Sequence, residues 1–315
     1  MGFDGLWVDR SLALSEPQDF TINTVRPPES LAPYINSFYT FRSESNLIRD
    51  VQPASFGHVM FFLNGAGEAR FIDGTIFESH PISLIGPSTS AMQYLVKGPF
   101  HCIGLAFHPA GYFSFTGQNA KDSSNRLTDG KQAMRDMRLG LLAQLKELNA
   151  GSPSEENDQK MFGLLAQHLE GRFKPVRQKH DDAITKMFEW LNSSLSPELS
   201  ELYDIVEISP RQMQRICNDH IGCSPKYLIR KYRAIRASMI LNDPDCDNAK
   251  RDQLSDYFYD QPHMIRELNL FTGRTPKIID QEATPLLQMW LDRAKAAEKS
   301  GIYPQISPKE DDHPQ

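Results

Sequence analysis

Residues 209–236 form the stretch that most limits how this chain can fold. They read SPRQMQRICNDHIGCSPKYLIRKYRAIR. A serine cap followed by proline at the first helical position is a typical helix start, because that proline loses no intrahelical hydrogen bond. Ser209 and Pro210 therefore predict the start of a helix, with Gln212 completing a capping box. Gly222 predicts its end about three turns later.

Apolar residues in this helix follow helical spacing. Met213, Ile216 and Cys217 form one stripe, which leaves the polar side chains on the other faces. The segment contains seven lysine or arginine residues and one acid, Asp219, a formal charge of +6, whereas the whole chain carries −6. A basic segment in an acidic protein indicates a docking surface for phosphates.

Two blocks of this sequence resemble the AraC/XylS transcription regulators. SPRQMQRI, from Ser209, and GCSPKYLIRKYRAIRA, from Gly222, are similar to the first helix-turn-helix and connecting helix of that family. DQPHMIRELNLFTGRTP, residues 260–276, is similar to its second helix-turn-helix and closing signature. Two ordered blocks at this separation are a specific signal, and the resemblance covers about residues 180–285.

The resemblance implies a recognition helix in each of two modules, each entering a major groove with its N-terminal residues facing the bases. Arginine can hold guanine and glutamine can hold adenine through paired hydrogen bonds. Arg230, Arg233 and Arg236 match positions kept mainly for structure and phosphate proximity. The residues expected to contact DNA are Arg211, Gln212, Gln214, Arg215 and Lys226 in the first module and Gln261, His263 and Arg266 in the second, with Arg211, Gln214 and Arg215 as the main base readers.

The N-terminal part predicts β-structure. Short apolar runs at residues 59–63, 82–85 and 102–107 are separated by the turn signals Asn64-Gly65, Asp73-Gly74, Gly86-Pro87 and Lys97-Gly98-Pro99. Many short strands at fairly even spacing indicate an antiparallel sandwich or barrel. Residues 81–117 resemble the cupin-like sensor domain of many of these regulators.

Histidines in this part lack the spacing of a metal site. A metal-binding cupin needs two histidines one residue apart with a carboxylate and a third histidine following, and His58, His80, His101 and His108 do not show it. No metal is expected. His108-Pro109-Ala110-Gly111 is interpreted as a structural turn.

Between the two parts, leucine and methionine spacing predicts amphipathic helices at residues 131–149 and from Met161 to Gly171. Two interpretations of this pair stay open, a homodimer interface or packing on the barrel. Residues 172–180, which contain Pro175, suit a linker. A further amphipathic helix is expected at residues 284–299, followed by a disordered tail.

These elements predict an α+β multidomain protein: an N-terminal cupin-like antiparallel β-barrel with helices and a C-terminal all-α domain of two helix-turn-helix motifs joined by a long helix. The expected boundaries are 1–125 for the barrel, 126–175 for the helical linker region, 176–285 for the DNA-binding domain and 286–315 for the C-terminal helix and tail. A length of 315 residues suits two domains.

Composition and motifs argue against several other classes of protein. No apolar run approaches the ~20 residues that cross a bilayer, so a cytoplasmic protein is expected and no membrane partner. Four cysteines are scattered without a C-x-x-C pair, which suggests buried reduced thiols. No G-x-S-x-G elbow or GxxxxGK phosphate loop is present, so we expect no enzyme, no catalytic residues and no cofactor.

The leading hypothesis is a sequence-specific DNA-binding transcription regulator whose partner is double-stranded operator DNA. By the resemblance, a small-molecule effector or a partner would act at the barrel, the protein would form a homodimer, and an activator would contact RNA polymerase.

The alternative is a protein-interaction module with this fold but without sequence-specific reading. Residues 243–260 contain six aspartates against Lys250 and Arg251, and like charge repels a second phosphate backbone. Glu207 and Tyr257 also stand where the family has a turn glycine, which would cost on the order of 1 kcal/mol if the turn were left-handed.

Overall fold

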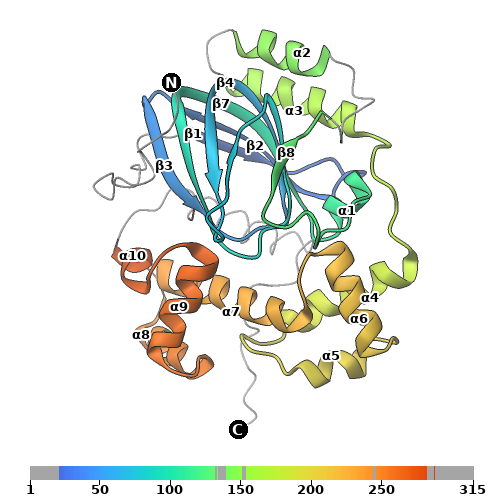
Figure 1. The fold of residues 1–315 in the computed structure, drawn as a ribbon, viewed down its shortest axis with the longest axis vertical. Coiled ribbons are helices and arrows are strands. Elements are labelled where there is room, and N and C mark those ends of the chain that lie inside the picture. The colour runs from blue at the N-terminus through green and yellow to red at the C-terminus, as the bar shows by residue number, and fades with distance from the viewer. Residues whose placement is uncertain are drawn as a thin grey trace.

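The computed structural model describes residues 21–131, 133, 140–150, 154–243, 246–281 and 287. A β-barrel forms one half and a group of helices the other, with two further helices covering the far side of the barrel (Figure 1). The expected fold class is confirmed.

Eight antiparallel strands make the barrel sheet, in the order β1-β2-β7-β4-β6-β8, with β3 paired to β7 and β5 paired to β4. The strands are β1 (Thr21–Val25), β2 (Ile35–Ser43), β3 (Leu47–Gln52), β4 (His58–Arg70), β5 (Ile76–Glu78), β6 (Ile82–Ile85), β7 (Met92–Phe107) and β8 (Leu127–Asp129). The three apolar runs identified in the sequence all lie in strands. The last strand, β8, lies just beyond residue 125.

Two of the predicted turns are wrong, because the strands continue through them. Asn64-Gly65 lies inside β4, where the register against β7 shifts twice. Lys97-Gly98-Pro99 lies inside β7. The first half of β7 pairs with β3 and the second half with β2. A bulge bends a strand without ending it. Gly65 and Gly98 therefore mark the bends at which β4 and β7 curve to form the barrel. Asp73-Gly74 is a true turn, with Gly74 at φ +84°.

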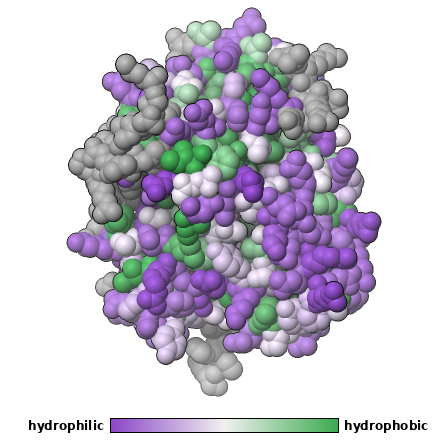
Figure 2. All heavy atoms as spheres, in the orientation of Figure 1, coloured by the Kyte–Doolittle hydropathy of each residue, from purple (hydrophilic) through white to green (hydrophobic). Residues whose placement is uncertain are grey.

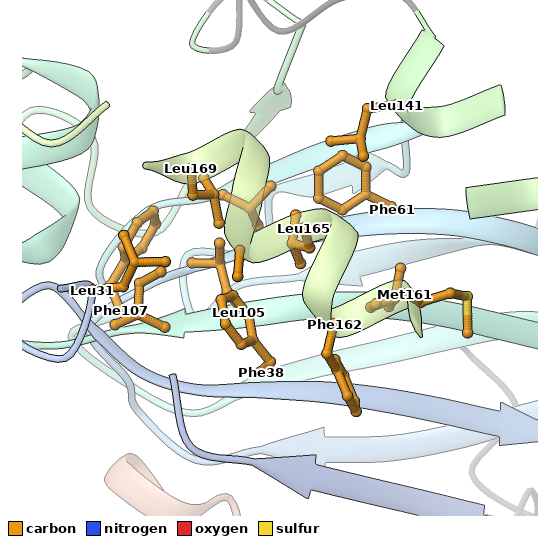
Figure 3. Packing of buried hydrophobic residues seen from close by; sticks show 14 of the residues in the cluster. Leu31, Phe38, Phe61, Leu105, Phe107, Leu141, Met161, Phe162, Leu165 and Leu169 are labelled. Atoms are coloured by element: carbon orange, nitrogen blue, oxygen red, sulfur yellow. The ribbon is translucent and has the colours of Figure 1, made fainter. Parts of the chain in front are cut away.

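Helices α2 (Gly140–Asn149) and α3 (Glu155–Leu169) pack on the outside of the barrel. Met161, Phe162, Leu165 and Leu169 of α3 lie against barrel residues such as Phe38 (Figure 3). The apolar stripe of α3 is therefore covered by the barrel. Of the helix expected at 131–149, residues 132 and 134–139 lie outside the described residues, and the described part contains α2, Gly140–Asn149.

The helical half contains α4 (Gln178–Leu191), α5 (Leu199–Ile205), α6 (Pro210–His220), α7 (Pro225–Asn242), α8 (Asn248–Gln253), the 3₁₀ helix η2 (Leu254–Tyr257), α9 (Gln261–Thr272) and α10 (Pro276–Gln281). Helix α7 joins two groups, with α4, α5 and α6 at one end and α8, α9 and α10 at the other (Figure 1). A short helix that the sequence did not indicate, α1 (Gly111–Thr116), follows the turn at His108–Gly111. The helix expected at 284–299 lies, except for Leu287, outside the described residues.

The two residues that stand where the family has a turn glycine, Glu207 and Tyr257, are not strained by a left-handed backbone. Within the described part of the chain, Asn125 is the one non-glycine residue with a positive φ. Glu207 and Tyr257 therefore take ordinary backbone conformations, and the expected cost of about 1 kcal/mol for a left-handed residue does not arise.

Candidate nucleic-acid interface

Helix α6 begins as its sequence predicts. The Ser209 hydroxyl accepts a hydrogen bond from the Gln212 amide at 3.3 Å, with Pro210 in the first turn. Met213, Ile216 and Cys217 are fully buried against α4 and α7. Because these three residues anchor one face, the opposite face of α6 is left to solvent.

The expected readers of the first module lie on that opposite face. Arg211, Gln214 and Arg215 are exposed and Gln212 is half-buried. Lys226 is exposed in the first turn of α7, which Ser224 caps. Hydrophilic side chains cover most of the helical half on the face in Figure 2. An exposed row of arginine and glutamine at the start of a helix has the reach and the donors to contact base edges.

The C-terminal end of α6 contacts the barrel. The backbone amides of Ala120 and Lys121 donate to the carbonyls of Asp219 and Asn218, at 2.8 and 3.0 Å. Asn119 donates to the Asp219 carboxylate at 2.7 Å. One end of this helix is thus tied to the barrel while its N-terminal half stays accessible.

Not all of the basic segment is available to phosphates. Lys231 and Arg236 are buried, and Arg236 donates to the backbone carbonyls of Leu191 and Ser194. Arg230 and Arg233 both bind Glu267, at 2.7 and 2.6 Å. The three connecting-helix arginines are therefore structural, as expected. The formal charge of +6 overstates the basic surface available to phosphates, because only Arg211, Arg215 and Lys226 among the segment's seven basic residues are exposed.

Helix α9 of the second module is capped by Asp260, whose carboxylate accepts from the His263 amide at 2.6 Å. Gln261 and Arg266 are exposed. The His263 ring is half-buried, lying 3.3 Å from Glu267 and edge-on to Phe258. Of the three expected readers in this module, His263 is thus directed into the contact with Glu267.

Glu267 is a residue that sequence reasoning missed. Its side chain is 1% exposed and holds Arg230, Arg233 and His263 together. The sequence could have indicated its burial, because Glu267 is next to Leu268 on the face of α9 that packs on α7. A buried carboxylate needs paired cations, and α7 provides them.

The barrel and the helical half meet along an interdomain seam, formed by barrel residues 50–56 and 88–91 and by parts of α7 and α9. The Ala54 amide donates to Phe271 O at 2.9 Å, and the Ala91 amide to Leu270 O at 2.8 Å. Arg274 Nη2 lies 2.6 Å from Asp50 Oδ1, and both side chains are essentially inaccessible. The seam connects the barrel directly to the second module.

Lys231 crosses the same seam from α7. Its Nζ donates to Ser55 O at 3.2 Å and Ser88 O at 3.1 Å and lies 4.8 Å from the centre of the Phe56 ring. Burial lowers the pKa of Lys231 to about 8. The sequence carried a signal for this role, because Lys231 falls three residues after Leu228 and four before Ile235, on the apolar stripe of α7.

Inside the barrel lies a partly open cavity of about 80 Å³. Aromatic and aliphatic side chains such as Phe41, Phe62 and Phe100 line most of it, and Gln52, His58 and Tyr94 add polar atoms. His58 Nε2 lies 2.6 Å from Gln52 Nε2. A second hollow, of about 600 Å³, separates β4 and β7 from α9 and includes Arg266 in its lining.

Within the described residues, no group of three or more histidine, cysteine, aspartate or glutamate side chains is arranged to hold a metal ion. No helix in the described ranges is long and apolar enough to cross a membrane. His58, His80, His101 and His108 are not brought together as a ligand set.

Residues 23–129 match a family model described as a domain of unknown function (DUF6597). Among curated protein sequences, none matches this chain. Solved structures that match this chain include ToxT from Vibrio cholerae. An apo K231A form has a TM-score of 0.44 and 9% identity over 84% of this chain and 97% of that chain. A second ToxT structure has a TM-score of 0.42 and 11% identity over 84% and 100%. The AraC-like transcriptional activator CuxR has a TM-score of 0.29 and 15% identity over 70% and 86%.

Proposed function

We propose that this protein is a DNA-binding transcription regulator of the AraC type, whose first module reads sequence through α6. The observation that carries the proposal is the exposed row of Arg211, Gln214 and Arg215 on a capped helix whose opposite face is fully buried. Such a helix presents base-reading side chains in a fixed orientation. The role implies a cytoplasmic location and an operator in double-stranded DNA.

Reading by the second module is the finer part of the proposal. Gln261 and Arg266 are exposed on α9, and a base contact by Arg266 would replace its 3.9 Å ion pair with Asp260. His263 supports the fold through Glu267 and would contribute less to base reading than the sequence suggests. The two modules would contact adjacent major-groove segments, and a homodimer would double this footprint.

Regulation through the barrel follows from the interdomain seam. Both modules are bonded to the barrel, the first through Asp219 and the second through Arg274. A ligand or protein partner that alters the barrel would therefore change how α6 and α9 are held relative to each other. If the protein activates transcription, RNA polymerase is its further partner.

Selection from random duplex DNA tests the proposal, with the purified full chain at low and high salt. We expect one enriched motif, bound less tightly as salt rises because phosphate contacts release counterions. Two half-sites about one helical turn apart would show that both modules read. A single half-site that depends on Arg211, Gln214 and Arg215 would confine reading to α6.

The aspartate-rich segment before α9 favours the second candidate, a protein-interaction module without sequence-specific reading. Asp252, Asp256 and Asp260 lie close to the N-terminus of α9, where a phosphate backbone would pass. No enrichment of any motif at low salt would overturn DNA reading and favour this alternative.

A further inference from the structure

The cavity inside the barrel has a mainly hydrophobic wall. Its lining comes from strands on both sides of the barrel, including Met60 and Met92, whose flexible side chains adapt to ligand shape. The lining contains no lysine or arginine, and its one acidic residue is Glu68. An anion entering this cavity would lose its hydration without gaining a cation, which is costly.

One charged pair, Asp50 with Arg274, lies next to the cavity residue Tyr94. Asp50 stands opposite Tyr94 in the pairing of β3 with β7, so the two side chains share one face of the sheet. The Asp50 carboxylate is bound by Arg274 at 2.6 Å. The guanidinium is therefore held by its own carboxylate and is not free to bind an anionic ligand.

Tyr94 supplies the polar feature of this cavity. Its side chain lines the wall and is 9% exposed, yet its hydroxyl has no hydrogen-bond partner among the described residues. A buried hydroxyl without a partner is costly, so native structures rarely leave one unpaired. Burial first, and then the Asp50 carboxylate, raise the pKa of Tyr94. The hydroxyl therefore stays protonated and able to donate.

We propose that this cavity takes a small, uncharged, largely apolar molecule that accepts a hydrogen bond from the Tyr94 hydroxyl. The proposal rests on the regulatory role of the barrel and names the class of ligand that would serve it. A cavity of about 80 Å³ is smaller than the ~150 Å³ that encloses one benzene ring. Because it is partly open, a single ring could enter and extend towards solvent.

The position of Tyr94 connects this ligand to the seam. Tyr94 is a neighbour of Asp50, and Asp50 holds Arg274 at the end of α9. A ligand bound to Tyr94 would thus act next to the ion pair that joins the barrel to the second module. This gives the barrel a short physical path to the DNA-reading half.

Three probes of similar size test the ligand class on the full chain at pH 7. Phenol can accept a hydrogen bond, toluene has nearly the same shape without a polar group, and benzoate is an anion. Affinities come from ligand-observed NMR titrations up to millimolar concentration. We expect phenol and toluene to bind and benzoate to bind at least tenfold more weakly than phenol.

The Tyr94→Phe variant isolates the hydroxyl, because it keeps the ring. We expect phenol affinity to fall about three- to tenfold, the usual net effect of one hydrogen bond, while toluene affinity is unchanged. Ala69→Leu and Leu127→Phe, which fill the cavity from two sides, should abolish binding of both probes. Retained thermal stability checks that each variant is folded.

Four results would overturn the proposal: benzoate binding as tightly as phenol, equal effects of Tyr94→Phe on phenol and toluene, phenol binding retained in both folded cavity-filling variants, or no binding of either uncharged probe. The titrations contain no DNA. A failed titration therefore leaves DNA reading untouched, and a failed DNA selection leaves the ligand result in place.

Discussion

Arg274 at the end of α9 forms an ion pair with Asp50 of β3, 224 residues earlier in the chain, at 2.6 Å and with both side chains at most 1% exposed. Arg274 Nη1 also donates to Val51 O at 2.9 Å. This single side chain therefore bonds the second helix-turn-helix module to the barrel through both a carboxylate and a backbone carbonyl.

Breaking this pair should destabilise the protein strongly. In Asp50→Asn the Arg274 charge stays buried without its carboxylate, and we expect a loss of about 3–5 kcal/mol in urea unfolding at pH 7. Glu156→Gln, which removes the exposed Lys160–Glu156 pair, is the control and should leave the midpoint unchanged. The double variant Asp50→Leu/Arg274→Met should be more stable than Asp50→Leu alone or Arg274→Met alone, because it leaves no buried charge without a partner. If the double variant lost as much unfolding free energy as the two single variants together, Asp50 and Arg274 would not be energetically coupled.

Gly273 should be intolerant of a side chain for two separate reasons. Its φ is +71°, and an added Cβ would lie 2.2 Å from Val51 Cγ1 across the seam. Gly117 has nearly the same conformation, φ +68°, with nothing within 4 Å of such a Cβ, which makes Gly117→Ala a matched control. We expect Gly117→Ala to cost about 1–2 kcal/mol from backbone strain and Gly273→Ala clearly more.

Limited proteolysis of the two glycine variants shows where the extra cost arises. Gly273→Ala should expose the seam to cleavage, because α9 must move away from β3. Equal stability and equal cleavage patterns would show that Gly273 does not pack closely against the barrel.

Arg215 and Lys226 should affect DNA binding in different ways. Arg215→Ala should lower discrimination at one base pair by about 1–3 kcal/mol, whereas Lys226→Ala should weaken all sequences about equally and reduce the salt slope by about 1. Binding of the selected motif and its single-base variants, titrated at several salt concentrations, separates the two. Uniform weakening in Arg215→Ala would assign this arginine to the phosphates.

Acid should weaken the fold through His220. Burial first, and then the neighbouring His180, lower the pKa of His220 from 6.5 to about 4, while Asp219 acts in the opposite direction. The His220 ring packs between His180 of α4 and Phe113 of α1. Because the unfolded chain binds this proton more readily than the folded one, stability should fall as pH drops from about 6.5 to 4.

His220→Phe keeps an aromatic ring and removes the titration. Its free energy of unfolding should therefore depend less on pH over this range than that of the unaltered protein. His101, whose pKa is also lowered to about 4 by burial, is present in both proteins and cancels in the comparison. Parallel pH profiles would show that His220 does not titrate differently on folding.

The sequence by itself determined the local elements of the helical half. Ser209 caps α6 as predicted, and the buried stripe of α6 left Arg211, Gln214 and Arg215 exposed. Caps and stripes depend on residues three or four positions apart, so the sequence carries them directly. The apolar runs of β4, β6 and β7 were evident for the same reason.

Only the tertiary structure decided which strands continue through a bend and which charged side chains are buried. The glycines at 65 and 98 mark bends and not strand ends, because β4 and β7 pair across the bend. Lys231 was counted in the basic docking segment and no role was predicted for Arg274, yet both are buried and their partners Ser55, Ser88 and Asp50 come from the barrel. These partners lie more than 140 residues away in the chain, and no local pattern records a contact that only folding creates.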